Sequence, residues 1–301
     1  MNKKKLKIYF TDFWPNFQLE DNYFYNLLSL KYEVLIEDNT PDVLFHSADY
    51  SNKQDHLKYN NGFTKKIFFT GEDIDPSTID THYSLSFKEN SNHNYRLPLW
   101  TQYINWFDKN NNHTDRDPAY LISKESLTNS KKKTTLFKPF FCSFIASKPI
   151  GERVNFVPKL NEIQRVRNLG RLYSNSFIRI PGRGDQKTKL FFMNFFRFNV
   201  SFENTISDGY VTEKILHSLH SNSIPIYWGS SQVKKDFNPN SFIYYDDFKN
   251  DDTLIDTILE IYRNNEITLN YLNEPIFENN KIPEFAKPEN VLSVLSEFID
   301  K

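Results

Sequence analysis

The sequence predicts an α/β protein in which two units are each built on a parallel sheet. Short apolar runs bounded by polar turns recur along the chain, and helical patterns lie between them. A chain of 301 residues is long enough for two domains. A tract without strong periodicity, 110–135, divides the two series of runs. The expected domains are therefore 1–135 and 136–301, with the option that the terminal helix packs back on the first domain.

The first domain is expected to begin with a strand, a helix and three further strands. Apolar residues at 24, 27, 28 and 30 fall on one face of a helix over 23–30. Aromatic and β-branched runs around it predict strands at 6–10, 32–36, 42–45 and 66–70.

The second domain repeats this alternation. Its expected strands are 139–146, 196–202, 224–228 and 242–245, and its expected helices are 152–164, 212–221, 253–262 and 291–299. Two such units are expected to face each other across a cleft, which is where a ligand would bind.

The composition excludes two classes of partner. There are 37 Lys and Arg residues against 38 Asp and Glu, so no broad basic field is available for nucleic acid. The apolar run 191–198 is broken by Asn194 and Arg197, and no integral membrane segment is expected.

Cys142 is the single cysteine, which excludes an intramolecular disulfide. We expect a cytoplasmic protein, with peripheral attachment at the inner face of the membrane as the alternative.

The densest candidate for chemistry is the segment 201–230. It runs from the end of an expected strand through a polar turn into the start of an expected helix, where free N–H groups favour phosphate. At helical spacing Tyr210, Glu213, Lys214 and His217 share one stripe. An ordinary solvated helix face is the other interpretation of this stripe.

Three parts of this segment resemble a known signature. Phe202-Glu203-Asn204, the Tyr-Val-Thr-Glu-Lys run at 210–214 and the Ile-Pro-Ile-Tyr-Trp-Gly-Ser run at 224–230 resemble the donor-binding motif of bacterial α-1,3-fucosyltransferases of glycosyltransferase family 10. The similarity extends to 68–72, 146–153 and 233–239. It implies the GT-B architecture, with two Rossmann-like domains facing across a cleft, and inverting transfer of L-fucose from GDP-fucose.

The resemblance also implies roles for individual residues of the second domain. Glu213 and Tyr210 would meet the ribose, and Lys214 and Arg153 would meet the pyrophosphate. An Arg fork and a Lys charge can stabilise the leaving diphosphate without a metal. The expected donor-binding set is Arg153, Glu203, Asn204, Tyr210, Glu213 and Lys214.

Glu72 is the expected general base, again by resemblance. It follows the apolar run 67–70, and Gly71 allows a sharp turn that would bring a carboxylate to the sheet edge. A carboxylate in reach of a hydroxyl typically accelerates transfer about 10²- to 10⁴-fold. The alternative is a surface acid in a loop that also holds Asp73 and Asp75.

The acid-x-acid pattern of Asp73 and Asp75, repeated at Asp115 and Asp117, leaves a metal-dependent sugar-nucleotide transferase as an alternative. A catalytically inactive glycan-binding module is a second alternative. We expect no required cofactor and no metal site, with Mn or Mg as a stimulant at most.

The expected acceptor is a galactose-containing glycan such as N-acetyllactosamine or lactose. Fucose would go to O3 of its GlcNAc or Glc, as in Lewis-antigen or fucosyllactose linkages, and a mixed 1,3/1,4 specificity stays open. Trp14, Trp100 and Trp106 could each offer an apolar face to a sugar ring or belong to the core.

Overall fold

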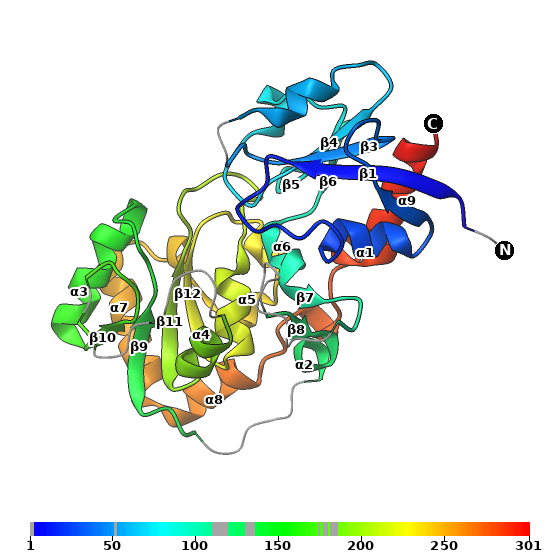
Figure 1. Ribbon diagram of the computed structural model, residues 1–301. Coiled ribbons are helices and arrows are strands. Elements are labelled where there is room, and N and C mark those ends of the chain that lie inside the picture. Colours follow the sequence, from blue (N-terminus) through cyan, green and yellow to red (C-terminus); the bar gives the residue numbers. More distant parts are fainter. Residues whose placement is uncertain are drawn as a thin grey trace. The chain divides into compact units, whose positions relative to one another are not determined.

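The computed structural model describes residues 3–50, 53–109, 120–129, 136–173, 175, 176, 180 and 186–301. The chain forms two compact units, shown in Figure 1. Unit 1 comprises Met1–Leu121 together with Pro283–Lys301, and unit 2 comprises Ile122–Ile282. Both are α/β, which confirms the predicted fold class.

Unit 1 is built on a six-stranded parallel sheet with the strand order β2-β1-β3-β4-β5-β6. Its order reverses between β1 and β3, since the chain first extends the sheet to one side and then to the other. Its elements are β1 (Lys5–Thr11), α1 (Tyr23–Ser29), β2 (Glu33–Ile36), β3 (Val43–His46), β4 (Lys65–Phe69), β5 (Tyr83–Ser86), β6 (Asn94–Arg96), β7 (Ile104–Asn105) and α9 (Pro288–Asp300).

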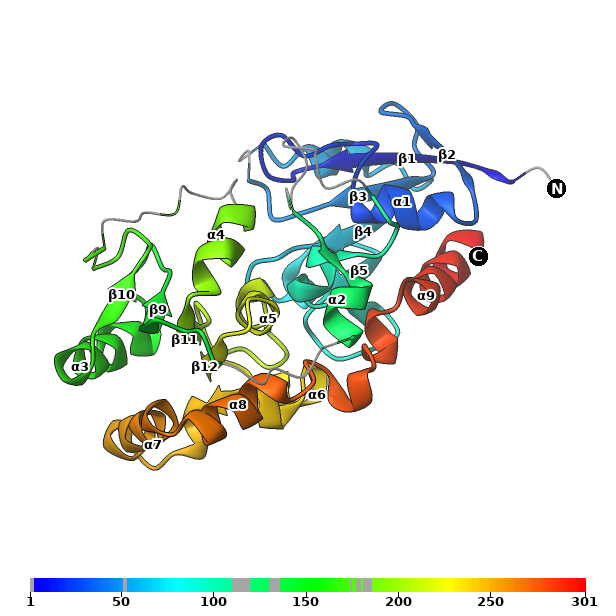
Figure 2. The ribbon, with the colours of Figure 1, turned by 90° about the horizontal axis from the view of Figure 1, so that it is seen from below.

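The terminal helix α9 completes the core of unit 1. Its buried residues Val291, Leu295 and Ile299 join one hydrophobic cluster with α1 and the sheet. Figures 1 and 2 both show α9, in red, beside the blue α1. The structure therefore divides the chain after Leu121, not at 135, and returns 283–301 to unit 1. The physical reason is that the apolar face of α9 is buried against the first sheet.

Unit 2 contains a five-stranded parallel sheet with the strand order β10-β9-β11-β12-β13, so its order reverses between β9 and β11. Its elements are β8 (Ile122–Ser123), α2 (Lys124–Thr128), β9 (Phe140–Phe144), α3 (Phe156–Ile163), β10 (Val166–Asn168), α4 (Gln186–Met193), β11 (Phe196–Phe202), α5 (Glu213–His220), β12 (Ile224–Trp228), α6 (Val233–Asp236), β13 (Ile243–Tyr244), α7 (Asp251–Arg263) and α8 (Asn265–Asn273).

The central strand β11 has two different faces. Phe198, Val200 and Phe202 join the hydrophobic cluster formed with α3 and α7. Asn199 and Ser201 alternate with them and bond toward α5. Side chains alternate across a strand, so one face of β11 holds an apolar core and the other a buried polar layer.

Several elements were not predicted from the sequence. Strands β5, β6 and β10 are three or four residues long, and α8 is rich in Asn. Such segments carry little periodicity of their own and form because neighbouring elements bury them. The expected helix over 152–164 is in fact a 3₁₀ turn, Gly151–Val154, followed by α3. Gly151, the residue before the expected helix, has a φ of +58, so the 3₁₀ turn starts from a left-handed residue.

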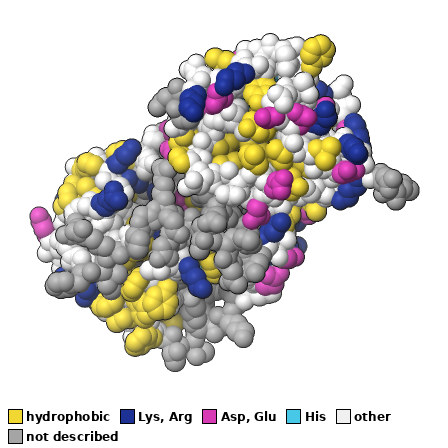
Figure 3. Space-filling view, in the orientation of Figure 1, with side chains coloured by type: hydrophobic (Ala, Val, Ile, Leu, Met, Phe, Trp, Pro, Cys, Tyr) yellow, Lys and Arg dark blue, Asp and Glu magenta, His cyan; other side chains and the backbone are white. Residues whose placement is uncertain are grey.

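The surface carries charges of both signs. In Figure 3, Lys and Arg side chains lie interspersed with Asp and Glu over the visible face, in agreement with the net charge of -1. Across the described part of the chain, no helix combines the length and apolarity that crossing a bilayer requires.

Candidate functional site

The polar residues of unit 2 gather where the order of its strands reverses. Arg153 lies in the 3₁₀ turn that follows β9, and Glu203 directly follows β11. Parallel neighbours present their carboxyl ends at one edge, so segments distant in sequence meet there. The open edge at such a reversal is where α/β sheets bind ligands.

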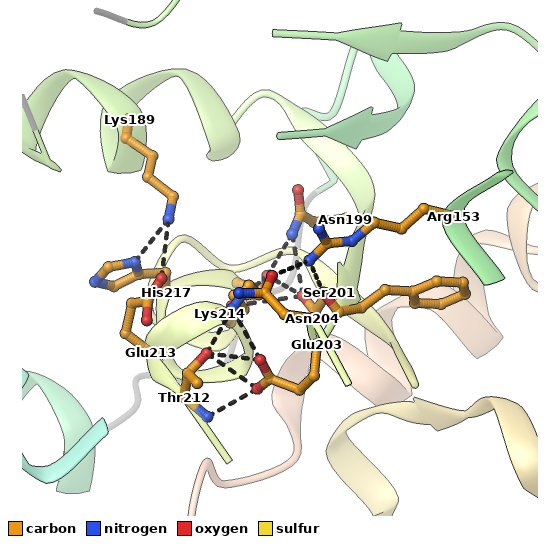
Figure 4. A network of polar contacts seen from close by, with 12 residues as sticks. Arg153, Lys189, Asn199, Ser201, Glu203, Asn204, Thr212, Glu213, Lys214 and His217 are labelled. Carbon is orange, nitrogen blue, oxygen red and sulfur yellow. Dashed lines mark hydrogen bonds and ion pairs between the residues drawn. The ribbon is translucent and has the colours of Figure 1, made fainter. Parts of the chain in front are cut away.

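The carboxylate of Glu203 is completely buried and organises the start of α5. It accepts hydrogen bonds from the backbone N–H of Thr212 at 2.7 Å and from the Thr212 hydroxyl at 2.8 and 3.0 Å. Its Oε2 also accepts from Nζ of Lys214 at 2.8 Å. Figure 4 shows both oxygens of Glu203 turned toward these two residues. Glu203 therefore supports the site from behind, by holding Thr212 and Lys214 in place.

Arg153 is held at the carboxyl end of β11. Its Nη2 donates to the carbonyl of Phe202 at 2.6 Å and to Oδ1 of Asn204 at 2.9 Å. Only 3% of the residue is exposed, and burial lowers the pKa of its guanidinium below its usual value. Its Nε is buried and makes no hydrogen bond within the described residues. The guanidinium thus retains hydrogen-bonding capacity that the protein itself leaves unused.

Two further charges lie at the first turn of α5. Burial would raise the pKa of Glu213, but Lys214 and Lys189 outweigh it and hold that pKa at about 2. Burial would likewise lower the pKa of Lys214, but Glu203 and Glu213 outweigh it and raise that pKa. Both side chains are therefore ionised at neutral pH. Their opposite charges sit at a helix N-terminus that already favours anions.

Lys189 was not predicted as a site residue. It lies on α4, and its Nζ is 3.0 Å from Nδ1 of His217 and 4.0 Å from Oε1 of Glu213. Burial lowers the pKa of Lys189 and lowers that of His217 well below 6.5. An uncharged His217 can accept a hydrogen bond at Nδ1 from Nζ of Lys189. The polar stripe on α5 included His217, but nothing local in the sequence links it to a lysine 28 residues earlier.

A buried layer of small polar side chains holds the site elements together. Asn199 donates to the hydroxyls of Ser201 at 3.1 Å and Ser218 at 2.7 Å, and accepts from Ser143 on β9 at 2.7 Å. Ser218 in turn donates to the carbonyl of Lys214 at 3.0 Å. Satisfied buried networks of this kind rigidify the elements they join, here β9, β11 and α5.

The remaining predicted donor residues lie beside this network. Tyr210 is buried, and its backbone N–H donates to the carbonyl of Ser207 at 2.9 Å within the turn before α5. Asn204 is partly exposed and bonds Arg153. The structure thus brings the predicted donor residues to one edge of unit 2. Their contacts with a ligand stay a prediction.

Glu72, the predicted base, lies in unit 1 just beyond β4. It is partly exposed, its backbone N–H donates to Oγ1 of Thr70 at 3.0 Å, and its Oε1 is 3.4 Å from the hydroxyl of Tyr50. Gly71 is tightly packed, because a Cβ there would lie 2.9 Å from the Leu99 side chain. The turn after β4 therefore presents a carboxylate at the carboxyl edge of the first sheet.

The acids of the metal alternative can be located only in part. Asp75 caps a short 3₁₀ helix by accepting from the N–H of Ser77 and lies 3.8 Å from Nζ of Lys88. Among the described residues, no three His, Cys, Asp or Glu side chains converge so that they could hold a metal. Asp115 and Asp117 lie outside the described residues.

The three tryptophans differ in their burial. Trp100 is fully buried and Trp106 nearly so, which makes both of them core residues and not sugar platforms. Trp14 is partly exposed, and its ring meets that of Tyr50 edge to face with centroids 6.1 Å apart.

Comparison with known proteins finds similarity along most of the chain. Residues 130–278 match the family description "Glycosyltransferase family 10 (fucosyltransferase) C-term", and residues 8–103 match "Alpha-(1,3)-fucosyltransferase FucT N-terminal domain". The chain is 32% identical over 296 residues to the α-(1,3)-fucosyltransferase FucT of Helicobacter pylori, covering 89% of this chain. It spans 60% of the length of that relative.

Solved structures give the same result. A crystal structure of an α1,3-fucosyltransferase matches with a TM-score of 0.76 and 26% identity, covering 99% of this chain and 91% of that one. A structure of an α1,3-fucosyltransferase with GDP-fucose matches with a TM-score of 0.74 and 26% identity, covering 100% and 92%. Two parallel α/β units with this likeness define the GT-B type of glycosyltransferase fold. Within that class, the chain belongs to glycosyltransferase family 10.

Proposed function

We propose that this chain is an inverting α-1,3-fucosyltransferase, which transfers L-fucose from GDP-fucose to a hydroxyl of a galactose-containing glycan. The observation that carries the proposal is the cluster of Arg153, Glu203 and Lys214 at the strand reversal of unit 2. It is supported by the family match and by the likeness to an α1,3-fucosyltransferase solved with GDP-fucose.

The cluster has the chemistry that a nucleoside diphosphate leaving group requires. Departure of GDP concentrates negative charge on the pyrophosphate, and cations fixed in a water-poor site stabilise it without reorganisation. Arg153 supplies a buried planar donor with spare capacity, and Lys214 supplies a charge at the start of α5. Glu213 and Tyr210, beside them, would bind the ribose.

The base in this proposal is Glu72. A sugar hydroxyl is a weak nucleophile, and a partly exposed carboxylate in a turn can take its proton as the bond to the anomeric carbon forms. One carboxylate and no enzyme nucleophile correspond to a single displacement, which inverts the anomeric centre.

The proposed acceptor site is O3 of the GlcNAc or Glc in N-acetyllactosamine or lactose, and we propose that no metal is required. The test is incubation with GDP-fucose and each acceptor, followed by linkage analysis of the product by NMR. A 1,3-linked α-fucoside formed in excess chelator is the expected result.

The two rival functions give different outcomes in the same assay. Activity that chelator abolishes and only a divalent ion restores would favour the metal-dependent transferase. GDP-fucose binding without GDP release, with every acceptor, would favour a glycan-binding module that lacks catalysis.

A further inference from the structure

We propose that Tyr50 positions Glu72 for proton abstraction, and that Asp12 holds the segment that carries Tyr50. The inference rests on the proposed function, because it takes Glu72 as the base. It concerns unit 1 alone, where all three residues lie.

These residues meet where the strand order of unit 1 reverses. Asp12 directly follows β1, Tyr50 lies in the connection after β3, and Glu72 lies just beyond β4. Strands β1, β3 and β4 are consecutive neighbours in the sheet. Their carboxyl ends therefore bring together three side chains that are well separated in the sequence.

The contact between Tyr50 and Glu72 restrains one carboxylate oxygen. The Tyr50 hydroxyl donates to Oε1 of Glu72 at 3.4 Å, which leaves Oε2 as the oxygen to receive a proton. The Tyr50 ring is itself positioned, because it meets the Trp14 ring at an interplanar angle of 84°. A base whose second oxygen is tethered loses less rotational freedom when the acceptor hydroxyl arrives.

Asp12 bonds Tyr50 and the beginning of the 3₁₀ turn Asp55–Tyr59. Its carbonyl accepts from the backbone N–H of Tyr50 at 3.4 Å. Its carboxylate accepts from the backbone N–H groups of Asp55 and His56, each at 2.9 Å, and lies 2.6 Å from Nδ1 of His56. The imidazole of His56 stacks on that of His46, at the end of β3, with centroids 4.8 Å apart.

Asp12 is suited to this anchoring by its backbone. It is buried and has a φ of +61, a left-handed conformation that Asp tolerates better than most residues. This conformation turns the chain sharply at the end of β1, and one residue then serves as acceptor for four donors. The backbone of Tyr50 is thereby bonded to the residue that ends β1.

The direct test is Tyr50→Phe, which removes the hydroxyl but keeps the ring against Trp14. We expect kcat to fall about three- to tenfold, the range typical of one lost hydrogen bond. GDP affinity and the KM for donor should stay within about twofold, since the donor residues lie in unit 2. Tyr59→Phe is the matched control, because Tyr59 lies in the same connection between β3 and β4 as Tyr50. Its hydroxyl donates to the carbonyl of Asp38 at 2.7 Å and not to Glu72. This control should leave kcat unchanged.

A double variant separates positioning from general stabilisation. In the Glu72→Gln background, Tyr50→Phe should not lower the residual rate further, because there is no base left to position. An equal fall in both backgrounds, or a normal kcat for Tyr50→Phe, would overturn the inference. Near-normal turnover by Glu72→Gln alone would instead refute the proposed base, and this inference with it. The single-variant result therefore shows which of the two proposals has failed.

Asp12→Asn gives an independent measurement. The substitution keeps the size of the side chain but removes its negative charge, which weakens the contact with Nδ1 of His56. We therefore expect kcat to fall in the wild-type background. In the Tyr50→Phe background the same change should have little effect. A full additional loss there would mean that Asp12 does not act through Tyr50.

Discussion

Nζ of Lys214 lies 2.8 Å from Oε2 of Glu203, a carboxylate that is completely shielded from solvent. The same oxygen accepts from the hydroxyl of Thr212, so one acid beyond β11 holds both the cap and the first turn of α5. We therefore expect stability and nucleotide binding to be linked through this carboxylate, and mutation can separate the two.

Lys214→Met should lower the free energy of unfolding by about 2 to 3 kcal/mol, because it leaves Glu203 buried without its cation. It should also weaken GDP binding about tenfold or more. Adding Glu203→Gln should recover part of the stability and none of the GDP affinity. Urea unfolding and calorimetry measure the two quantities. Recovery of GDP affinity in the double variant would mean that Lys214 has only a structural role.

Arg153→Ala should weaken GDP and GDP-fucose together, by about 10- to 100-fold, because both ligands carry the pyrophosphate. Arg197→Ala is the control. Arg197 lies near the start of β11, whereas Glu203 follows the other end of the same strand. The Arg197 guanidinium stacks on the ring of Tyr262. Calorimetric affinities that fall equally in both variants would remove Arg153 from the donor site.

Glu72→Gln should reduce turnover by about 10²- to 10⁴-fold, because the amide keeps the size of the side chain but cannot accept the proton. GDP affinity and the unfolding midpoint should be preserved. Asp73→Asn, in the same turn, should retain most of the activity. A well-folded Glu72→Gln protein with normal kcat would direct the search for the base to Asp73 and Asp75.

Gly151→Ala should disturb the site through Trp228. Gly151 has a φ of +58, and a Cβ there would lie 2.4 Å from the Trp228 ring. We expect a loss of about 1 to 3 kcal/mol in stability and weaker GDP binding, because Arg153 lies in the same 3₁₀ turn. Gly62→Ala also places alanine at a positive φ, +76, but in open space. It should cost stability without changing GDP affinity.

The stability of unit 1 should depend on pH through Asp300. Hydrogen bonds from Lys4 and Lys31 lower the pKa of this carboxyl despite its exposure. A lowered pKa stabilises the folded state above the unfolded value near 3.9, and that stabilisation is lost as the pH falls. Asp300→Asn should thus lower Tm at pH 7 by no more than about 4 °C. The difference from wild type should shrink as the pH falls below 4 and in 1 M salt.

The local elements could be predicted because their signals lie within a few residues. The helix expected over 212–221 is α5, with Thr212 and Ser221 as its two caps. Strand β12 has the predicted bounds, 224–228, and β11 has the predicted bounds, 196–202. Apolar periodicity and turn residues are properties of a short window of sequence. The elements that they predict therefore depend little on how distant parts of the chain pack.

The sequence proposed the members of the candidate site, but it could not show which of them are bonded to one another. The resemblance placed Glu203 in the donor-binding set, and the structure adds that its buried carboxylate is bonded to Thr212 and Lys214. It named Tyr210 and Glu213 without indicating that Lys189 faces Glu213. A sequence window cannot show which hydrogen-bonding groups of a residue are already occupied by the protein.

The sequence by itself determined the α/β class, the alternation of strands and helices and the signature at 202–230. The fold determined which segments distant in sequence share an edge. Arg153 donates to the carbonyl of Phe202, and Nζ of Lys189 lies against His217. Helix α9 packs on the first sheet although most of the chain separates the two in sequence. The physical reason is that these contacts depend on sheet order and on which apolar faces bury one another. Neither property is encoded in the spacing of neighbouring residues.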